Sequence, residues 1–135
     1  MKYKKQLVFF YPSIEIGGLT KNLFSLINSL SKKKYKINFI TFESLNKGVV
    51  AKKLYPFDKK INVITPKFFT KTNNRYLKYF FCFFTLLKLC SDGKFLIVSF
   101  QSNILSIIAA KLTNCKVIIR CNTAPSKYIS NFTKK

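Results

Sequence analysis

Short apolar runs alternate with segments of helical periodicity along this chain, and no other feature constrains its fold as strongly. Five runs rich in Val, Ile and Phe predict buried strands over 6–11, 36–42, 61–64, 95–100 and 116–120. Repeated strand–helix units require right-handed crossovers and a parallel sheet that helices cover on both faces. We therefore expect an α/β, Rossmann-like fold with strand order 3-2-1-4-5.

The segments between these runs predict helices and the side of each helix that packs on the sheet. The helices are expected over 19–33, 74–90 and from Ser102 or Asn103 onward, with a short one over 49–54. In the first helix the expected buried residues are Leu19, Leu23, Leu26, Ile27 and Leu30. In the last they are Leu105, Ile108, Ala109 and Leu112.

The segment 74–90 is unusually aromatic on one side. The polar side carries Arg75, Lys78, Thr85 and Lys88, and the other side carries Tyr76, Tyr79, Phe80, Phe83 and Phe84. Two interpretations stay open. The aromatic side packs on the sheet as core, or it lies at an anionic membrane surface with basic residues over the headgroups.

The net charge is +21, from 25 basic and four acidic residues. Such an excess is typical of proteins that bind nucleic acid or anionic membranes. All but two of the basic residues, Arg75 and Arg120, are lysines, although arginine is the better bidentate partner for phosphate. A coding bias that enriches lysine at surface positions explains this pattern, an anionic membrane surface is the second explanation, and nucleic acid is the least favoured partner.

The four cysteines argue against a metal site and against export. They have no C-x-x-C spacing, and the chain has no histidine. Cys82, Cys90 and Cys115 lie in or beside apolar runs, so we expect them to be small buried hydrophobic residues of a protein in a reducing compartment.

The longest apolar stretch, 79–87, is well short of the roughly 20 residues that span a bilayer. We expect no metal or other cofactor, and a cytoplasmic location, free or peripheral at the inner face of the plasma membrane.

Three loop segments are expected to meet where ligands bind in such a fold. In a parallel sheet of this order, the carboxyl ends of the first and fourth strands flank the topological switch point. The segments 12–20, 100–103 and 120–125 follow strands that end there. Gly17-Gly18 either cradles an anion at the start of a helix or makes a tight turn, and it lacks the G-x-G-x-x-G spacing of a dinucleotide site.

The residues of these segments resemble a known enzyme family. The sequences YPSIEIGGLTKNL at 11–23, VSFQSN at 98–103 with AAKL at 109–112, and IIRCNTAPS at 118–126 are similar to family-four glycosyltransferases. The resemblance implies the GT-B architecture, two Rossmann-like domains facing across a cleft. The segment 1–135 would be the N-terminal, acceptor-side domain, inactive alone and completed by a C-terminal donor-binding domain not contained in this sequence.

The same resemblance implies the substrates and the site. A retaining enzyme of surface-polysaccharide synthesis would move a sugar from a nucleotide-sugar donor to a glycan or lipid-linked acceptor. Gly17 and Gly18 would face the donor diphosphate, and no catalytic residue is assigned. The acceptor side would draw on Glu15, Gln101, Ser102, Asn103, Arg120, Asn122 and Thr123.

Structural roles compete for each of those acceptor-side residues. Arg120 can be a solvated strand end, Asn122 and Thr123 can hold their own loop, and 101–103 can cap the following helix. Glu15 can simply solvate a turn. Two other classes of function also stay open: a non-catalytic Rossmann-like module that binds nucleotides or phosphate, and a basic nucleic-acid-binding domain with salt-sensitive affinity.

Overall fold

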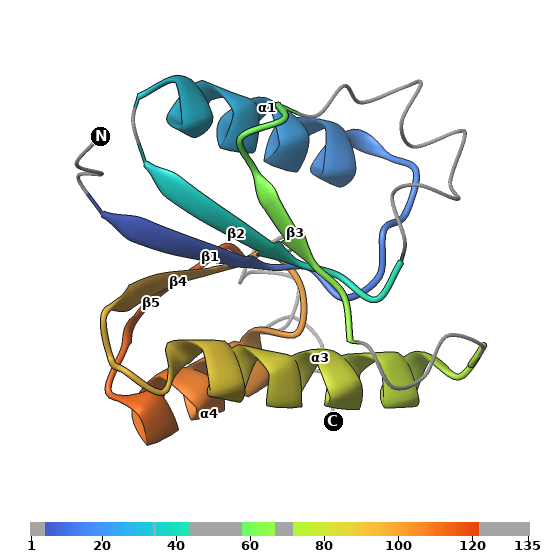
Figure 1. Ribbon diagram of the computed structural model, residues 1–135. Helices are drawn as coiled ribbons and strands as arrows, with labels where there is room; N and C mark the ends of the chain where they lie inside the picture. The colour runs from blue at the N-terminus through green and yellow to red at the C-terminus, as the bar shows by residue number, and fades with distance from the viewer. Residues whose placement is uncertain (1–4, 34, 44–57, 67–71, 122–135) are drawn as a thin grey trace, which may run out of the picture.

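The computed structural model describes residues 5–33, 35–43, 58–66 and 72–121 (Figure 1). Its centre is a five-stranded parallel sheet with the order β3-β2-β1-β4-β5. The strands are β1 (Gln6–Phe10), β2 (Lys36–Ile40), β3 (Asn62–Ile64), β4 (Phe95–Ser99) and β5 (Lys116–Ile119). This confirms the predicted strand order. The helix expected over 49–54 lies outside the described residues.

Helices cover both faces of the sheet, as predicted. α1 (Gly18–Lys32) lies on one face, and α3 (Arg75–Cys90) and α4 (Asn103–Thr113) lie side by side on the other (Figure 1). Each helix runs antiparallel to the strands, so each begins at the edge where the strands have their carboxyl ends. That edge is where the three loop segments of interest meet.

β1 is apolar throughout because both of its faces are covered. Leu7 and Phe9 pack with α1 on one side, while Val8 and Phe10 pack with α3 and α4 on the other. Successive strand residues point to opposite faces, so a strand with two covered faces needs an unbroken apolar run. The register pairs 6–10 with 36–40 on one side and with 95–99 on the other.

The packing side of α1 differs from the prediction at one position. Leu23, Phe24 and Ile27 are buried against the sheet, and Phe24 meets the Phe39 ring edge-on at a centroid distance of 5.9 Å. Leu19 and Leu30 are partly buried, as expected. Leu26 is 40% exposed, so its predicted burial is wrong. The contact face is centred on Leu23 and Ile27, and Phe24 rather than Leu26 completes it.

The layer of α3 and α4 departs further from the prediction, because all but one of the buried helix residues there, Leu86, are small. α3 buries Cys82, Leu86 and Cys90, and α4 buries Ser106, Ala109 and Ala110. Small side chains let a helix lie close to the strands, which leaves its larger residues on the outside. Leu105 packs partly into this core, but the predicted burial of Ile108 and Leu112 is wrong. Of the two interpretations of the aromatic side of α3, packing as core holds in part for Phe83 and does not hold for Phe80 and Phe84, which are exposed.

Two of the cysteines behave as the sequence predicts. Cys82 and Cys90 are fully buried, and burial raises the pKa of both thiols to about 12 because the thiolate loses its hydration. Cys115 is half-buried and donates to the Cys90 carbonyl at 3.6 Å, while Cys121 is exposed.

Within the described ranges, no helix is long and apolar enough to cross a membrane.

Candidate functional site at the carboxyl edge of the sheet

Gly17 and Gly18 lie between β1 and the first turn of α1, where the fold leaves room for a side chain at either position. Gly17 is extended, with φ 171°, and its carbonyl accepts the first helical hydrogen bond from the Lys21 amide at 3.1 Å. A Cβ added to either glycine meets nothing within 4 Å. The space in front of the helix start is therefore open, and this is where the first amides of a helix concentrate positive charge.

A buried hydroxyl pair anchors the loop between β1 and α1. Thr20 in the first turn of α1 donates to the carbonyl of Glu15, and the Tyr11 hydroxyl lies 2.9 Å from the Thr20 hydroxyl. Since the Thr20 proton is already used, Tyr11 is the donor to Thr20. Burial raises the pKa of Tyr11, which keeps this hydroxyl protonated. The pair holds the loop, and with it Gly17, at a fixed place beside the helix.

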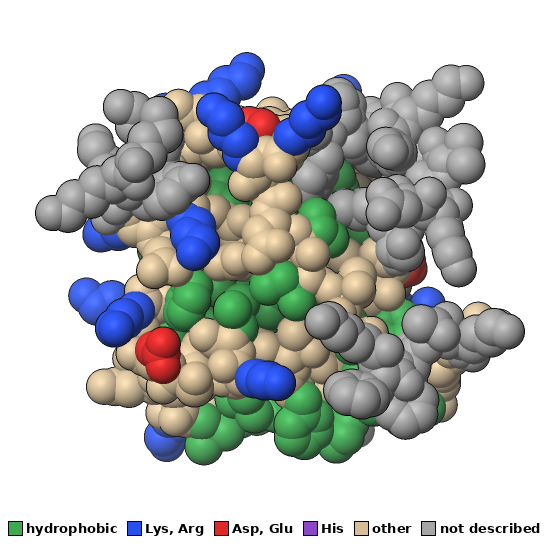
Figure 2. Space-filling view, in the orientation of Figure 1, with side chains coloured by type: hydrophobic (Ala, Val, Ile, Leu, Met, Phe, Trp, Pro, Cys, Tyr) green, Lys and Arg blue, Asp and Glu red, His purple; other side chains and the backbone are tan. Residues whose placement is uncertain are grey.

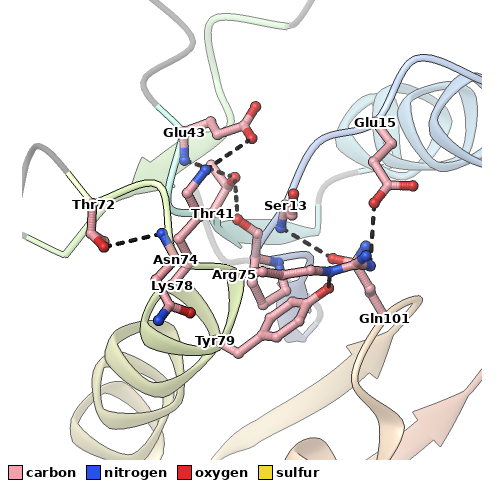
Figure 3. A network of polar contacts seen from close by, with 11 residues as sticks. Ser13, Glu15, Thr41, Glu43, Thr72, Asn74, Arg75, Lys78, Tyr79 and Gln101 are labelled. Atoms are coloured by element: carbon pink, nitrogen blue, oxygen red, sulfur yellow. Dashed lines mark hydrogen bonds and ion pairs between the residues drawn. The ribbon is translucent and has the colours of Figure 1, made fainter.

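The predicted residues after β4 tie neighbouring loops together. The side-chain oxygen of Gln101 accepts from the backbone amide of Ser13 at 3.1 Å, which links the loops after β4 and β1 (Figure 3). Ser102 takes the cap position before α4 in a left-handed conformation, with φ 56°. Its side chain makes no capping hydrogen bond, so it caps α4 by position alone.

Asn103 joins three elements with one side chain. Its oxygen accepts from the Ser99 hydroxyl at 3.0 Å, and its nitrogen donates to the Arg120 carbonyl at 3.2 Å. The end of β4, the start of α4 and the end of β5 therefore meet at this amide. Gly17 and Asn103 lie at the same edge, as predicted, because β1 and β4 are neighbouring parallel strands.

We expect Asn103→Ala to lower the free energy of unfolding by about 1–2 kcal/mol, because two hydrogen bonds between elements are lost together. Chemical denaturation of the two proteins measures the difference. Asn22→Ala, at an exposed position on α1, is the matched control and should change stability by much less. Equal effects of the two substitutions would show that Asn103 does not hold the strand ends.

Arg120 lies at the mouth of the same edge. Its amide donates to the Ser99 carbonyl at 3.0 Å, and its guanidinium carbon lies 5.3 Å from the centre of the Phe100 ring. The ring supports the guanidinium without using its hydrogen-bond donors, and the side chain is exposed. Arg120 is thus available to an anion. Asn122 and Thr123 lie outside the described residues, so their predicted roles stay predictions.

The start of α3 brings two cations to this edge, Arg75 and Lys78, which sequence reasoning did not assign to the site. The Arg75 guanidinium lies 3.2 Å from the Glu15 carboxylate and donates to the Tyr79 hydroxyl at 2.8 Å (Figure 3). The hydrogen bond to Tyr79, followed by the charge interactions, raises the pKa of Arg75. Both members of the ion pair are more than half exposed, so the pair positions charge rather than stabilising the fold.

Glu43 is a second acid at this edge that sequence reasoning missed. Its backbone amide donates to the Thr41 hydroxyl at 3.3 Å, and Lys78 lies 3.9 Å from its carboxylate (Figure 3). Burial raises the pKa of Glu43, and the Lys78 charge only partly opposes this. The sequence contained a signal for these residues, because in a parallel α/β fold every strand-to-helix loop lies at the carboxyl edge. Glu43 follows β2 and Arg75 is the first residue of α3, so this rule places both at that edge.

A separate cavity of about 330 Å³ lies away from these residues, between the end of β3 and the outer side of α3. Apolar side chains form most of its wall, and none of the predicted site residues lines it. Its lining consists of Ile64, Thr65, Pro66, Phe81, Phe84, Thr85 and Lys88.

Comparisons with family models, with curated proteins and with solved structures find no match to this chain. Within the described ranges, no group of three or more His, Cys, Asp or Glu side chains forms a metal site. The structure itself defines the class: an α/β protein with a Rossmann-like parallel sheet. The carboxyl edge of that sheet presents the open glycine pair and two glutamates, each of which forms an ion pair with a basic residue of α3. It also presents Arg120, whose guanidinium lies over the Phe100 ring.

Proposed function

We propose that this chain is the acceptor-side domain of a retaining glycosyltransferase. It would move a sugar from a nucleotide-sugar donor to a glycan or lipid-linked acceptor, together with a donor-binding domain. The observation that carries the proposal is the glycine pair: a Cβ at Gly17 or Gly18 meets nothing within 4 Å, so the backbone at the start of α1 is open to an approaching ligand. The similarity of residues 11–23 to the opening of family-four enzymes supports the same conclusion.

In this proposal the chain contributes positioning and charge. The diphosphate of the donor lies against the start of α1, whose amides stabilise the negative charge that grows as the bond from the anomeric carbon to the diphosphate breaks. The acceptor hydroxyl oxygen bonds to the anomeric carbon on the same face, and its proton leaves with the diphosphate. Holding the two substrates in this geometry supplies a large part of the rate enhancement.

The contacts at the edge divide the candidate residues by role. Asn103 and Gln101 use side-chain atoms to join loops, which makes them positioning residues. Glu15, Arg75 and Arg120 are exposed, and their charges are free to exchange partners with a substrate. These three are the residues that we propose for direct contact with the acceptor.

Titration of the isotope-labelled chain with uridine and guanosine diphosphate sugars, followed by backbone NMR, tests this proposal. We expect the amide signals of Gly17, Gly18 and Leu19 to shift first, with a dissociation constant of about a millimolar because only one domain contributes contacts. Sulfate at equal ionic strength controls for the net charge of +21.

Two outcomes would contradict this assignment. If none of the diphosphate sugars shifts these amides, the glycine pair is not a donor site. If inorganic pyrophosphate shifts them as strongly as any nucleotide sugar, the chain is better described as a phosphate-binding module without sugar specificity.

A further inference from the structure

The outer surface of the α3 and α4 layer is apolar across both helices. On α3, Tyr76, Phe80 and Phe84 are 83%, 54% and 52% exposed, and Leu77 is also exposed. On α4 the exposed large residues are Ile104, Ile107, Ile108 and Leu112. Figure 2 shows hydrophobic side chains along the lower rim of the molecule, where Figure 1 places these helices. We call these eight residues the outer apolar face.

Among the described residues, the opposite layer has no such surface. The exposed residues of α1 include Lys21, Asn22, Ser25, Ser29 and Lys32, and Leu26 is its one exposed large hydrophobic residue. The same chain therefore presents a polar helix on one side of the sheet and two apolar helices on the other. Exposed apolar surfaces of this extent mark sites that something else covers.

The charges around the outer apolar face are almost all positive. α3 and α4 contain no acidic residue, and the segment 72–121 holds seven basic residues and one acid, Asp92. Lys88 follows Phe84 by one helical turn and Lys111 follows Ile107 by one turn, so both lysines lie on the outward sides of their helices, and both are exposed. Lysine stems lie along apolar surface while the ammonium reaches outward.

We propose that the outer apolar face docks on the surface of an anionic lipid bilayer. Aromatic and aliphatic side chains would enter the boundary between headgroups and acyl chains, and Lys88 and Lys111 would meet the lipid phosphates. The cavity of about 330 Å³ beside Phe84 and Lys88 continues this face inward and offers an apolar hollow next to a cation.

Charge favours this occupant over a second copy of the chain. Two copies would bring together two chains of net charge +21, and the lysines of one outer apolar face would oppose those of the other. An anionic bilayer instead supplies both the apolar interior and the opposite charge. The inference rests on the outer apolar face alone, and it holds whether or not the chain belongs to a glycosyltransferase.

Co-sedimentation of the full chain with lipid vesicles tests the proposal. Vesicles of phosphatidylcholine alone are compared with vesicles in which about one third of the lipid is phosphatidylglycerol, and we expect binding at least about tenfold tighter to the anionic ones. The double variant Phe80→Ser/Phe84→Ser should weaken that binding by about tenfold or more, because two aromatic anchors are lost. Lys88→Glu/Lys111→Glu should have an effect of similar size.

Matched variants on α1 distinguish the contribution of the outer apolar face to vesicle binding from the contribution of the chain's net charge. Leu26→Ser removes an exposed leucine and Lys21→Glu/Lys32→Glu reverses two exposed charges, both on the opposite layer. Vesicle binding should be nearly unchanged by Leu26→Ser and reduced less by the α1 charge reversal than by the α3 and α4 reversal. Circular dichroism checks that every protein is folded. If the double phenylalanine variant does not fold, Ile104→Ser/Leu112→Ser takes its place.

Three results would overturn the proposal. Equal losses from the α1 variants would show that net charge alone drives binding. Unchanged binding of the folded serine variants would exclude the outer apolar face from the contact. A chain that ignores vesicles but forms dimers, which the same serine variants break, would assign the face to a second copy.

Discussion

Gly18→Val should weaken nucleotide-sugar binding about 100-fold while leaving the chain at least as stable. Gly18 is the first residue of α1, and a side chain there meets no protein atom within 4 Å. Valine costs less than glycine in a helix, so the melting temperature should stay level or rise. If a diphosphate approaches the backbone here, the branched side chain takes its place, and a 100-fold loss corresponds to about 2.7 kcal/mol, the contribution of one or two charged hydrogen bonds of about 1.5–3 kcal/mol each.

The control for this substitution lies on the same helix. Ser25→Val places the same branched side chain at an exposed position two turns away, where it should affect neither binding nor folding. Because the wild-type dissociation constant is about a millimolar, a 100-fold loss appears in the NMR titration as the absence of shifts at accessible donor concentrations, and thermal melting of the same samples measures stability. A folded Gly18→Val protein that binds the donor unchanged would refute the cradle, whereas a fall in melting temperature would indicate that glycine serves the turn.

The strand order was predictable because burial on both faces leaves a clear mark in the sequence. β1, with Leu7 and Phe9 on one face and Val8 and Phe10 on the other, has no polar residue between 7 and 10. Such runs, separated by helices, admit few parallel arrangements. The predicted strands extend one or two residues beyond the observed ones. At β1 the reason is that the buried apolar residue Tyr11 follows Phe10.

The packing sides of the helices were harder to predict, because hydrophobicity alone does not identify the buried side of a helix that is apolar on two sides. In α4, Ile108 and Leu112 are larger than Ala109 and Ser106, so the sequence favours them as core. The sheet instead accepts the small residues, which let the helix come close. The hydrophobic pattern of α4 does not indicate which partner covers these larger residues.

The site was predictable in its place but not in its contacts. Neighbouring parallel strands end at one edge, which is enough to bring Gly17 and Asn103 together. The pairing of Glu15 with Arg75 joins residues 60 positions apart, and it depends on where the loop before α3 delivers the helix. The double role of Asn103 depends on a side-chain orientation that no spacing encodes.

Phe39→Ala is expected to lower the free energy of unfolding by about 3–5 kcal/mol, the largest stability effect that we predict for a single side chain. Phe39 is completely buried in β2, packs with Phe24 and belongs to the core between the sheet and α1. Its removal leaves a cavity in close-packed surroundings. Since domains of this size are stable by about 5–15 kcal/mol, much of the chain's stability would be lost.

Phe80→Ala makes the same chemical change on the outer apolar face and is the matched comparison. Phe80 is more than half exposed, and its ring contacts include Phe84 and Phe81 on the same helix, at centroid distances of 4.7 Å and 6.3 Å. Its loss should cost less than about 1 kcal/mol, partly offset because alanine favours the helix. Urea denaturation of both variants measures the contrast. Equal losses would mean that Phe80 is covered in the free chain, which would also remove the surface on which membrane docking is proposed.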